Sequence, residues 1–70
     1  MTRSGVLRAL CRFDVATTDE IATACGGKRV QAASHLRALV TVGHAQTLGE
    51  NYIRYSATEA GRAAAKGKAA

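Results

Sequence analysis

Two adjacent glycines, Gly26 and Gly27, restrict the fold more than any other feature, because they separate two helix-forming stretches with almost no connecting chain. The stretch before them opens with Thr17, and Glu20 follows three residues later, which is the spacing of a capping box at a helix N-terminus. We predict that this helix, over about 18–25, ends where the glycines allow a positive φ angle. A second helix begins at once. Two short helices joined by a glycine turn of this length are typical of a helix-turn-helix.

The helix predicted after the glycine turn, over about 28–42, is amphipathic. Its apolar side chains recur at helical spacing and would form one buried stripe, which consists of Ala32, Leu36, Leu39 and Val40. Its first turn holds two adjacent cations, and its other face carries short polar or cationic side chains. Gly43 follows, where a helix naturally ends. A helix with this pattern can enter a DNA groove, so we predict that it is a recognition helix.

The segment after this helix predicts a β-hairpin. Residues 45–48 have the pattern of a strand, and residues 49–51 are usual turn residues. Residues 52–56 are rich in aromatic and β-branched side chains, as expected of the return strand. In this register Ile53 and Tyr55 share one face, which we expect to pack on the core.

Both ends of the chain are predicted to include a helix. Ser4 can cap a first helix that runs to about Arg12, and its apolar residues have the spacing of a single buried stripe. Residues 13–16 suit a short extended connection. Thr58 can cap a last helix, and residues 65–70 are predicted to form a frayed basic tail.

Composition favours a nucleic-acid partner over other partners. Ten Lys and Arg against five Asp and Glu give a formal net charge of +5, and the isoelectric point is about 9.9. Such an excess attracts phosphate without regard to sequence; a basic domain without a nucleic-acid partner is the alternative. Much of the apolar content is alanine and only three residues are aromatic. We therefore expect a thin core, with a dimer or a DNA complex adding to the stability of so short a chain.

Several classes of protein receive no support from the sequence. Cys11 and Cys25 lie in apolar helical patterns and are expected to be buried free thiols, although their spacing leaves a disulfide open. No run approaches the roughly 20 apolar residues of a membrane span, and no signal peptide is visible, so we expect a cytoplasmic protein. Catalytic sets of residues are not apparent, and neither an enzyme nor a cofactor or metal site is expected.

Residues of the recognition helix and the hairpin are the candidates for contact with DNA: Lys28, Arg29, Gln31, Ser34, His35, Arg37, Asn51, Tyr52 and Arg54. Arg29 and Gln31 are expected to reach base edges, because Arg pairs with guanine and Gln with adenine. Lys28, Ser34 and Arg37 are expected to contact phosphate, which fixes register without reading sequence.

For several of these residues a second interpretation stays open. His35 is as well placed to pack against the core as to meet DNA, and Arg37 can form a surface salt bridge. Asn51 and Arg54 suit minor-groove or phosphate contact, but Glu50 at the hairpin tip would repel DNA. Tyr52 can stack on a sugar or simply cover the hairpin.

Two stretches resemble bacterial regulators. Residues 33–43, ASHLRALVTVG, look like the ArsR-like pattern in which a His-Leu pair precedes a leucine and a glycine. Residues 55–62, YSATEAGR, are similar to the segment that closes the wing in MarR- and PadR-like proteins. The resemblance spans about 6–64, and it implies the winged helix-turn-helix DNA-binding core of a bacterial, phage or plasmid regulator.

The predicted fold is α+β and mainly α. It is a winged helix-turn-helix of three helices, a hairpin wing over 45–56 and a short C-terminal helix, in one domain over residues 1–70 with its folded core at 4–64. The predicted function is a transcriptional regulator that binds double-stranded DNA. A protein-interaction module that reuses the fold, and a nonspecific architectural or recombination accessory factor, are the alternatives.

We expect a homodimer that reads two half-sites about one helical turn apart. The first helix, with Val6, Leu7 and Leu10, and the last helix are both candidates for the dimer surface. Regulators of the resembled families usually carry extra helices for dimerisation and effector binding, for which 70 residues leave no room. No small-molecule effector is therefore expected.

Overall fold

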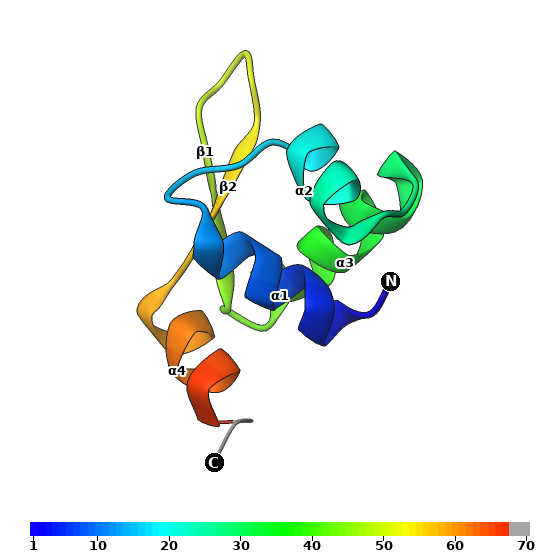
Figure 1. Ribbon diagram of the computed structural model, residues 1–70. Helices are drawn as coiled ribbons and strands as arrows, with labels where there is room; N and C mark the ends of the chain where they lie inside the picture. Colours follow the sequence, from blue (N-terminus) through cyan, green and yellow to red (C-terminus); the bar gives the residue numbers. More distant parts are fainter. Residues whose placement is uncertain (68–70) are drawn as a thin grey trace.

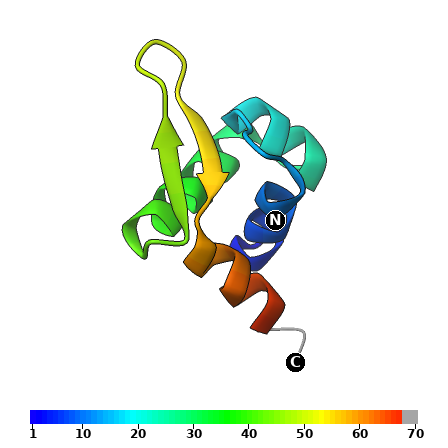
Figure 2. The same cartoon turned by 90° about the vertical axis from the view of Figure 1, so that its left-hand side faces the viewer.

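The computed structural model describes residues 1–67 and contains four helices and a two-stranded antiparallel sheet (Figure 1). In chain order these are α1 (Arg3–Arg12), α2 (Thr18–Cys25), α3 (Arg29–Thr41), β1 (Ala45–Leu48), β2 (Arg54–Ala57) and α4 (Glu59–Gly67). The hairpin extends from one end of the helical body and α4 lies at the other, as the two views agree (Figures 1 and 2). The element order is the predicted one.

The helix-turn-helix is built from local hydrogen bonds that the sequence predicts. The Thr17 hydroxyl accepts from the Glu20 amide at 3.2 Å, and the Glu20 carboxylate accepts from the Thr17 amide at 2.9 Å. This confirms the capping box. Gly26 then takes a φ of +68°, and the Gly27 amide donates to the carbonyl of Ala22 at 3.0 Å. The left-handed glycine therefore closes α2 and turns the chain directly into α3.

The start of α1 differs from the prediction. The capping residue is Thr2, whose hydroxyl accepts from the Gly5 amide at 3.0 Å, while Ser4 lies inside the first turn. Thr2 has the extended backbone that an N-cap requires and stands three residues before the amide it satisfies. The prediction that Ser4 caps this helix is therefore wrong by two residues.

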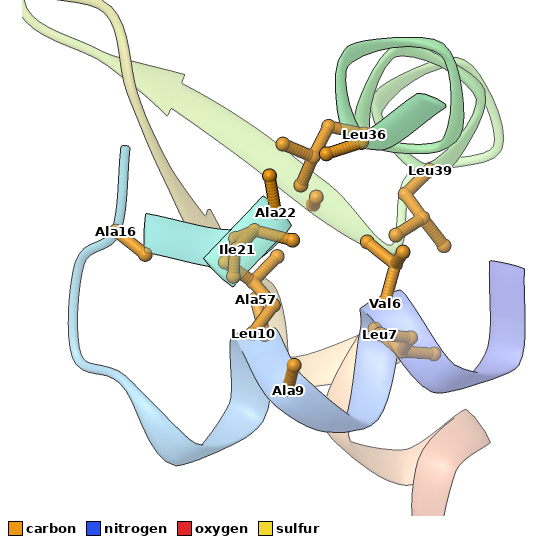
Figure 3. Close-up of a cluster of buried hydrophobic side chains, with 12 residues drawn as sticks. Val6, Leu7, Ala9, Leu10, Ala16, Ile21, Ala22, Leu36, Leu39 and Ala57 are labelled. Carbon is orange, nitrogen blue, oxygen red and sulfur yellow. The ribbon is translucent and has the colours of Figure 1, made fainter. Parts of the chain in front are cut away.

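The core lies where α1, α2 and α3 meet the base of the hairpin (Figure 3). Its largest fully buried side chains are Leu10, Ile21, Leu36, Leu39 and Val6. Alanine fills half of the buried apolar positions, at Ala9, Ala16, Ala22, Ala32, Ala45 and Ala57. The core is thus as thin as the composition indicates. Val40, predicted as part of the buried stripe, is only partly buried and packs at its edge.

The hairpin pairs Ala45 with Ala57 and Leu48 with Arg54. The predicted extended connection after α1 joins it at one point, where the amides and carbonyls of Ala16 and Tyr55 exchange hydrogen bonds of 2.9 and 2.7 Å. Tyr55 also packs against the core, as predicted. The hairpin is therefore anchored to the helical body through Ala16 and Tyr55.

The wing loop is longer than predicted. Residues 49–53 connect the strands, so Tyr52 and Ile53 belong to the loop and not to the return strand. Gly49 has a φ of +88°, and a side chain there would overlap the carbonyl oxygen of Tyr52. The loop thus folds back over Gly49 before the strand can resume. The prediction that Ile53 packs on the core is wrong, because Ile53 is 56% exposed.

Thr58 joins the end of the hairpin to the end of α3. Its hydroxyl donates to the carbonyl of Gly43 at 2.6 Å and accepts from the Gly61 amide at 3.0 Å, and its own amide donates to the carbonyl of His44 at 3.0 Å. The predicted cap of α4 is therefore confirmed. It also ties the C-terminal helix to the turn that ends the recognition helix.

Gly61 lets α4 approach this turn closely. A Cβ on Gly61 would lie 2.8 Å from the carbonyl carbon of His44 and would overlap its oxygen. In an ordinary helix Gly→Ala gains about 1 kcal/mol, but here we expect Gly61→Ala to lower the free energy of unfolding by about 1–3 kcal/mol through overpacking. Denaturant titration measures this decrease.

Gly5→Ala is the matched control for Gly61→Ala, because Gly5 is also helical. A Cβ there would meet only the hydroxyl oxygen of the Thr2 side chain, at 3.1 Å. We expect this change to cost less than Gly61→Ala or to be neutral. Equal destabilisation by the two variants would contradict the close-approach explanation.

Two other predictions are modified by the structure. Residues 65–67 belong to α4, so a frayed tail does not begin at residue 65, and the rest of the predicted tail lies outside the described residues. Cys11 and Cys25 are free thiols and are partly rather than fully buried. The Cys25 thiol donates a long hydrogen bond of 3.9 Å to the carbonyl of Gly5.

Candidate nucleic-acid interface

The outer face of α3 is a continuous exposed surface of one helix. Ala32, Leu36 and Leu39 point into the core (Figure 3 shows the two leucines). On the side opposite them the exposed residues are Val30, Ser34, Arg37 and Thr41, with Gln31 at its edge. Arg29 is exposed because it is the first residue of the helix. No residue of α3 is acidic. The exposed residues of this helix therefore include cations and no carboxylate.

Val30 is part of this face and was not among the predicted site residues. It is 79% exposed, an unusual place for a β-branched apolar side chain. At 100° per residue it falls between Arg37 and Ser34, opposite the buried stripe. That position on the helical wheel is the signal that could have identified it. An apolar side chain there is suited to the methyl group of thymine.

The first turn of α3 brings together Lys28, Arg29 and Gln31. Lys28 is the residue before the helix and is exposed. The side-chain oxygen Oε1 of Gln31 accepts a hydrogen bond from the backbone amide of Lys28 at 3.2 Å. The side-chain NH₂ group of Gln31 and the second lone pair of Oε1 remain available. Arg29 makes an ion pair across the turn, from its Nε to Oδ1 of Asp19 at 3.3 Å. All three side chains are open to solvent.

The remaining predicted residues of α3 differ in exposure. Ser34 and Arg37 are exposed, and Arg37 makes no salt bridge among residues 1–66. His35 is half-buried at the edge of the open face. Burial thus leaves both interpretations of His35 in place, whereas the salt-bridge alternative for Arg37 finds no partner in the described part of the chain.

The wing candidates lie on a separate element. Asn51, Tyr52 and Arg54 are all exposed, and Tyr52 is 79% exposed. Glu50 is exposed beside them at the tip. The hairpin stands clear of the helical body in both views (Figures 1 and 2), so its tip is accessible to a partner. At this exposure little of Tyr52 is packed against the rest of the protein.

Other kinds of site are not prominent in residues 1–66. No group of three or more His, Cys, Asp or Glu in this range could hold a metal ion. An open groove of about 560 Å³ lies between α1, the end of α3 and α4, lined by residues such as Leu7, Leu39 and Val42. Among the described helices, none is long and apolar enough to cross a lipid bilayer.

This arrangement defines a winged helix-turn-helix domain: a tight glycine turn joins α2 to α3, α3 exposes cationic side chains, and a hairpin follows. The chain superposes on BpsR of Bordetella bronchiseptica with a TM-score of 0.89 and 15% identity, over 96% of this chain and 50% of that one. BpsR was solved to explain how 6-hydroxynicotinic acid regulates its DNA binding. The MarR family transcriptional regulator SPO1453 of Silicibacter pomeroyi DSS-3 matches with a TM-score of 0.81 and 18% identity, over 93% of this chain and 48% of that one.

These similarities establish the fold. The predicted winged helix-turn-helix, and its likeness to MarR-type regulators at the level of fold, are confirmed. The chain spans about half the length of each of these two solved proteins. No family model and no curated protein matches the chain significantly.

Proposed function

We propose that the protein is a transcriptional regulator that binds double-stranded DNA, with α3 in the major groove and the hairpin as wing. The observation that carries the proposal is the exposed face of α3. It presents cations and short polar side chains, contains no carboxylate, and stands in a winged scaffold. A helix of this diameter fits the major groove of B-form DNA.

The individual contacts follow from position on α3. Arg29 and Gln31 stand in the first turn, the part of a recognition helix that meets base edges, and we assign them to base reading. Lys28, Ser34 and Arg37 are assigned to phosphate. The half-buried His35 is kept as a contact at the margin of the face. On the wing, Asn51, Tyr52 and Arg54 are assigned to the backbone or the minor groove.

Binding of duplexes over a salt series tests the proposal. Sequences selected from a random duplex library should bind more tightly than random duplex, and the logarithm of the affinity should fall linearly with the logarithm of salt concentration. Linear salt dependence without sequence preference would instead identify a nonspecific architectural or recombination accessory factor. Absence of salt-sensitive affinity would favour the protein-interaction module, for which the acidic Glu50 at the wing tip is the specific support.

We also propose that the protein acts as a homodimer in the cytoplasm, without a catalytic role or a small-molecule effector. Val6 and Leu10 are fully buried within the single chain, which favours the last helix over the stripe of α1 as the dimer surface. The last helix, with the groove that it forms beside Leu7 and Val42, is the stronger candidate. The duplexes selected in this experiment show whether the protein binds as a dimer, because a symmetric dimer selects inverted half-sites about one helical turn apart.

A further inference from the structure

We infer that Asp19 is a positioning residue that holds Arg29 ready to read a guanine. This inference rests on the proposed function and adds to it a specificity device outside the recognition helix. Asp19 lies in the first turn of α2, and its Oδ1 is 3.3 Å from Nε of Arg29 at the start of α3. The pair spans the glycine turn, so the helix-turn-helix fixes the distance between the two backbone positions from which these side chains extend.

The atom that Arg29 uses in this ion pair determines which of its N–H donors can still bind a base. The ion pair joins Asp19 to Nε of Arg29, and Arg29 makes no ion pair with any other residue among residues 1–66. A guanidinium group is a planar fork with five donors. With Nε occupied, the two Nη groups still form the end of the fork that can pair with O6 and N7 of a guanine.

The exposure of both side chains indicates that the ion pair adds little to the stability of the fold. The two side chains are 73% and 74% exposed, and an ion pair that is open to water contributes little to folding. Its effect is instead on the freedom of Arg29. A long side chain that is already restrained loses less conformational entropy when it binds a base.

Charge makes the inference testable, because two effects of Asp19 on DNA binding have opposite signs. As a carboxylate near the phosphate backbone it repels every duplex equally. As a positioning residue it favours only those sequences that place guanine opposite Arg29. Asp19→Ala should therefore raise affinity for random duplex slightly, and it should reduce the preference for guanine at one position by about twofold to fivefold, the range that an exposed ion pair can supply.

The experiment measures affinity for the selected duplex and for versions with each other base pair at that position. In the Arg29→Ala background, Asp19→Ala should leave the base preference unchanged, because the reader is gone. Glu59→Ala is the matched control: it removes an acidic residue from the first turn of α4, and Glu59 makes no ion pair among residues 1–66. It should leave the guanine preference intact.

Two outcomes would overturn the inference. Asp19→Ala could leave the guanine preference unchanged, also while raising affinity for all sequences alike, which would show that Asp19 acts only through its charge. It could also change the preference equally with and without Arg29. Each of these outcomes still requires salt-sensitive, sequence-selective binding by the unaltered protein. Absence of that binding is a failure of the proposed function and is distinguished before any variant is made.

Discussion

Leu36→Ala is expected to lower the free energy of unfolding by about 2–5 kcal/mol. Leu36 is fully buried and points from α3 toward Ala22 of α2 (Figure 3). A domain of this size is stabilised by roughly 4–10 kcal/mol in total, so one substitution removes a large share. The decrease should be near the upper end of this range. Half of the buried positions are alanines, and a methyl group is too short to move into the cavity that Leu36→Ala leaves. Thermal or denaturant unfolding, followed by circular dichroism, measures it.

Val30→Ala is the control for this prediction on the same helix. Val30 is exposed, so truncating it leaves no cavity, and alanine has the higher helix propensity. Its stability should stay within about 0.5 kcal/mol of the unaltered protein. If Leu36→Ala were as mild as Val30→Ala, the core assigned to α3 would be wrong.

The fold is predictable because its start and stop signals are local. The capping pair Thr17 and Glu20, the left-handed Gly26 and the buried stripe of α3 each depend on neighbours within a few residues. The two caps satisfy backbone groups of their own helix end, and the stripe follows from the helical period alone. The order of elements follows from them.

The wing is less predictable because strand bounds depend on pairing across the hairpin. Tyr52 and Ile53 have side chains that favour strands, but the register that pairs Leu48 with Arg54 leaves them in the loop. The alternation itself holds, because Tyr55 packs on the core as predicted, but the loop extends through Ile53. Alternation along the strand therefore predicts a core position for Ile53, although its side chain is exposed.

The candidate site is predictable only as a surface of one helix. Periodicity separates the open face of α3 from its buried stripe, but contacts between elements are not visible in the sequence. The ion pair of Asp19 with Arg29 joins two helices, and the contact of Gly61 with the backbone of His44 joins residues 17 positions apart. Both depend on how the elements pack, and neither residue type indicates its partner.

Substitutions on the exposed face of α3 should separate base reading from phosphate attraction. The double change Arg29→Ala and Gln31→Ala removes two side chains assigned to bases, each worth about 1–3 kcal/mol of discrimination. We expect the preference for the selected duplex over random duplex to collapse. The double change Lys28→Ala and Arg37→Ala should instead weaken binding to all duplexes alike, and it should reduce the salt slope by about 0.9 for each phosphate that is no longer neutralised.

Arg62→Ala controls for the removal of positive charge, because Arg62 is exposed and belongs to α4 rather than to α3. It should change the salt slope less than either single change at Lys28 or Arg37. Equal effects of Arg62→Ala and Arg37→Ala on affinity would mean that net charge alone attracts DNA. An intact sequence preference after Arg29→Ala and Gln31→Ala would move the reading surface elsewhere, with Val30 and Ser34 on the same face as the next positions to substitute. The comparison thus decides whether the first turn of α3 reads sequence or only contributes charge.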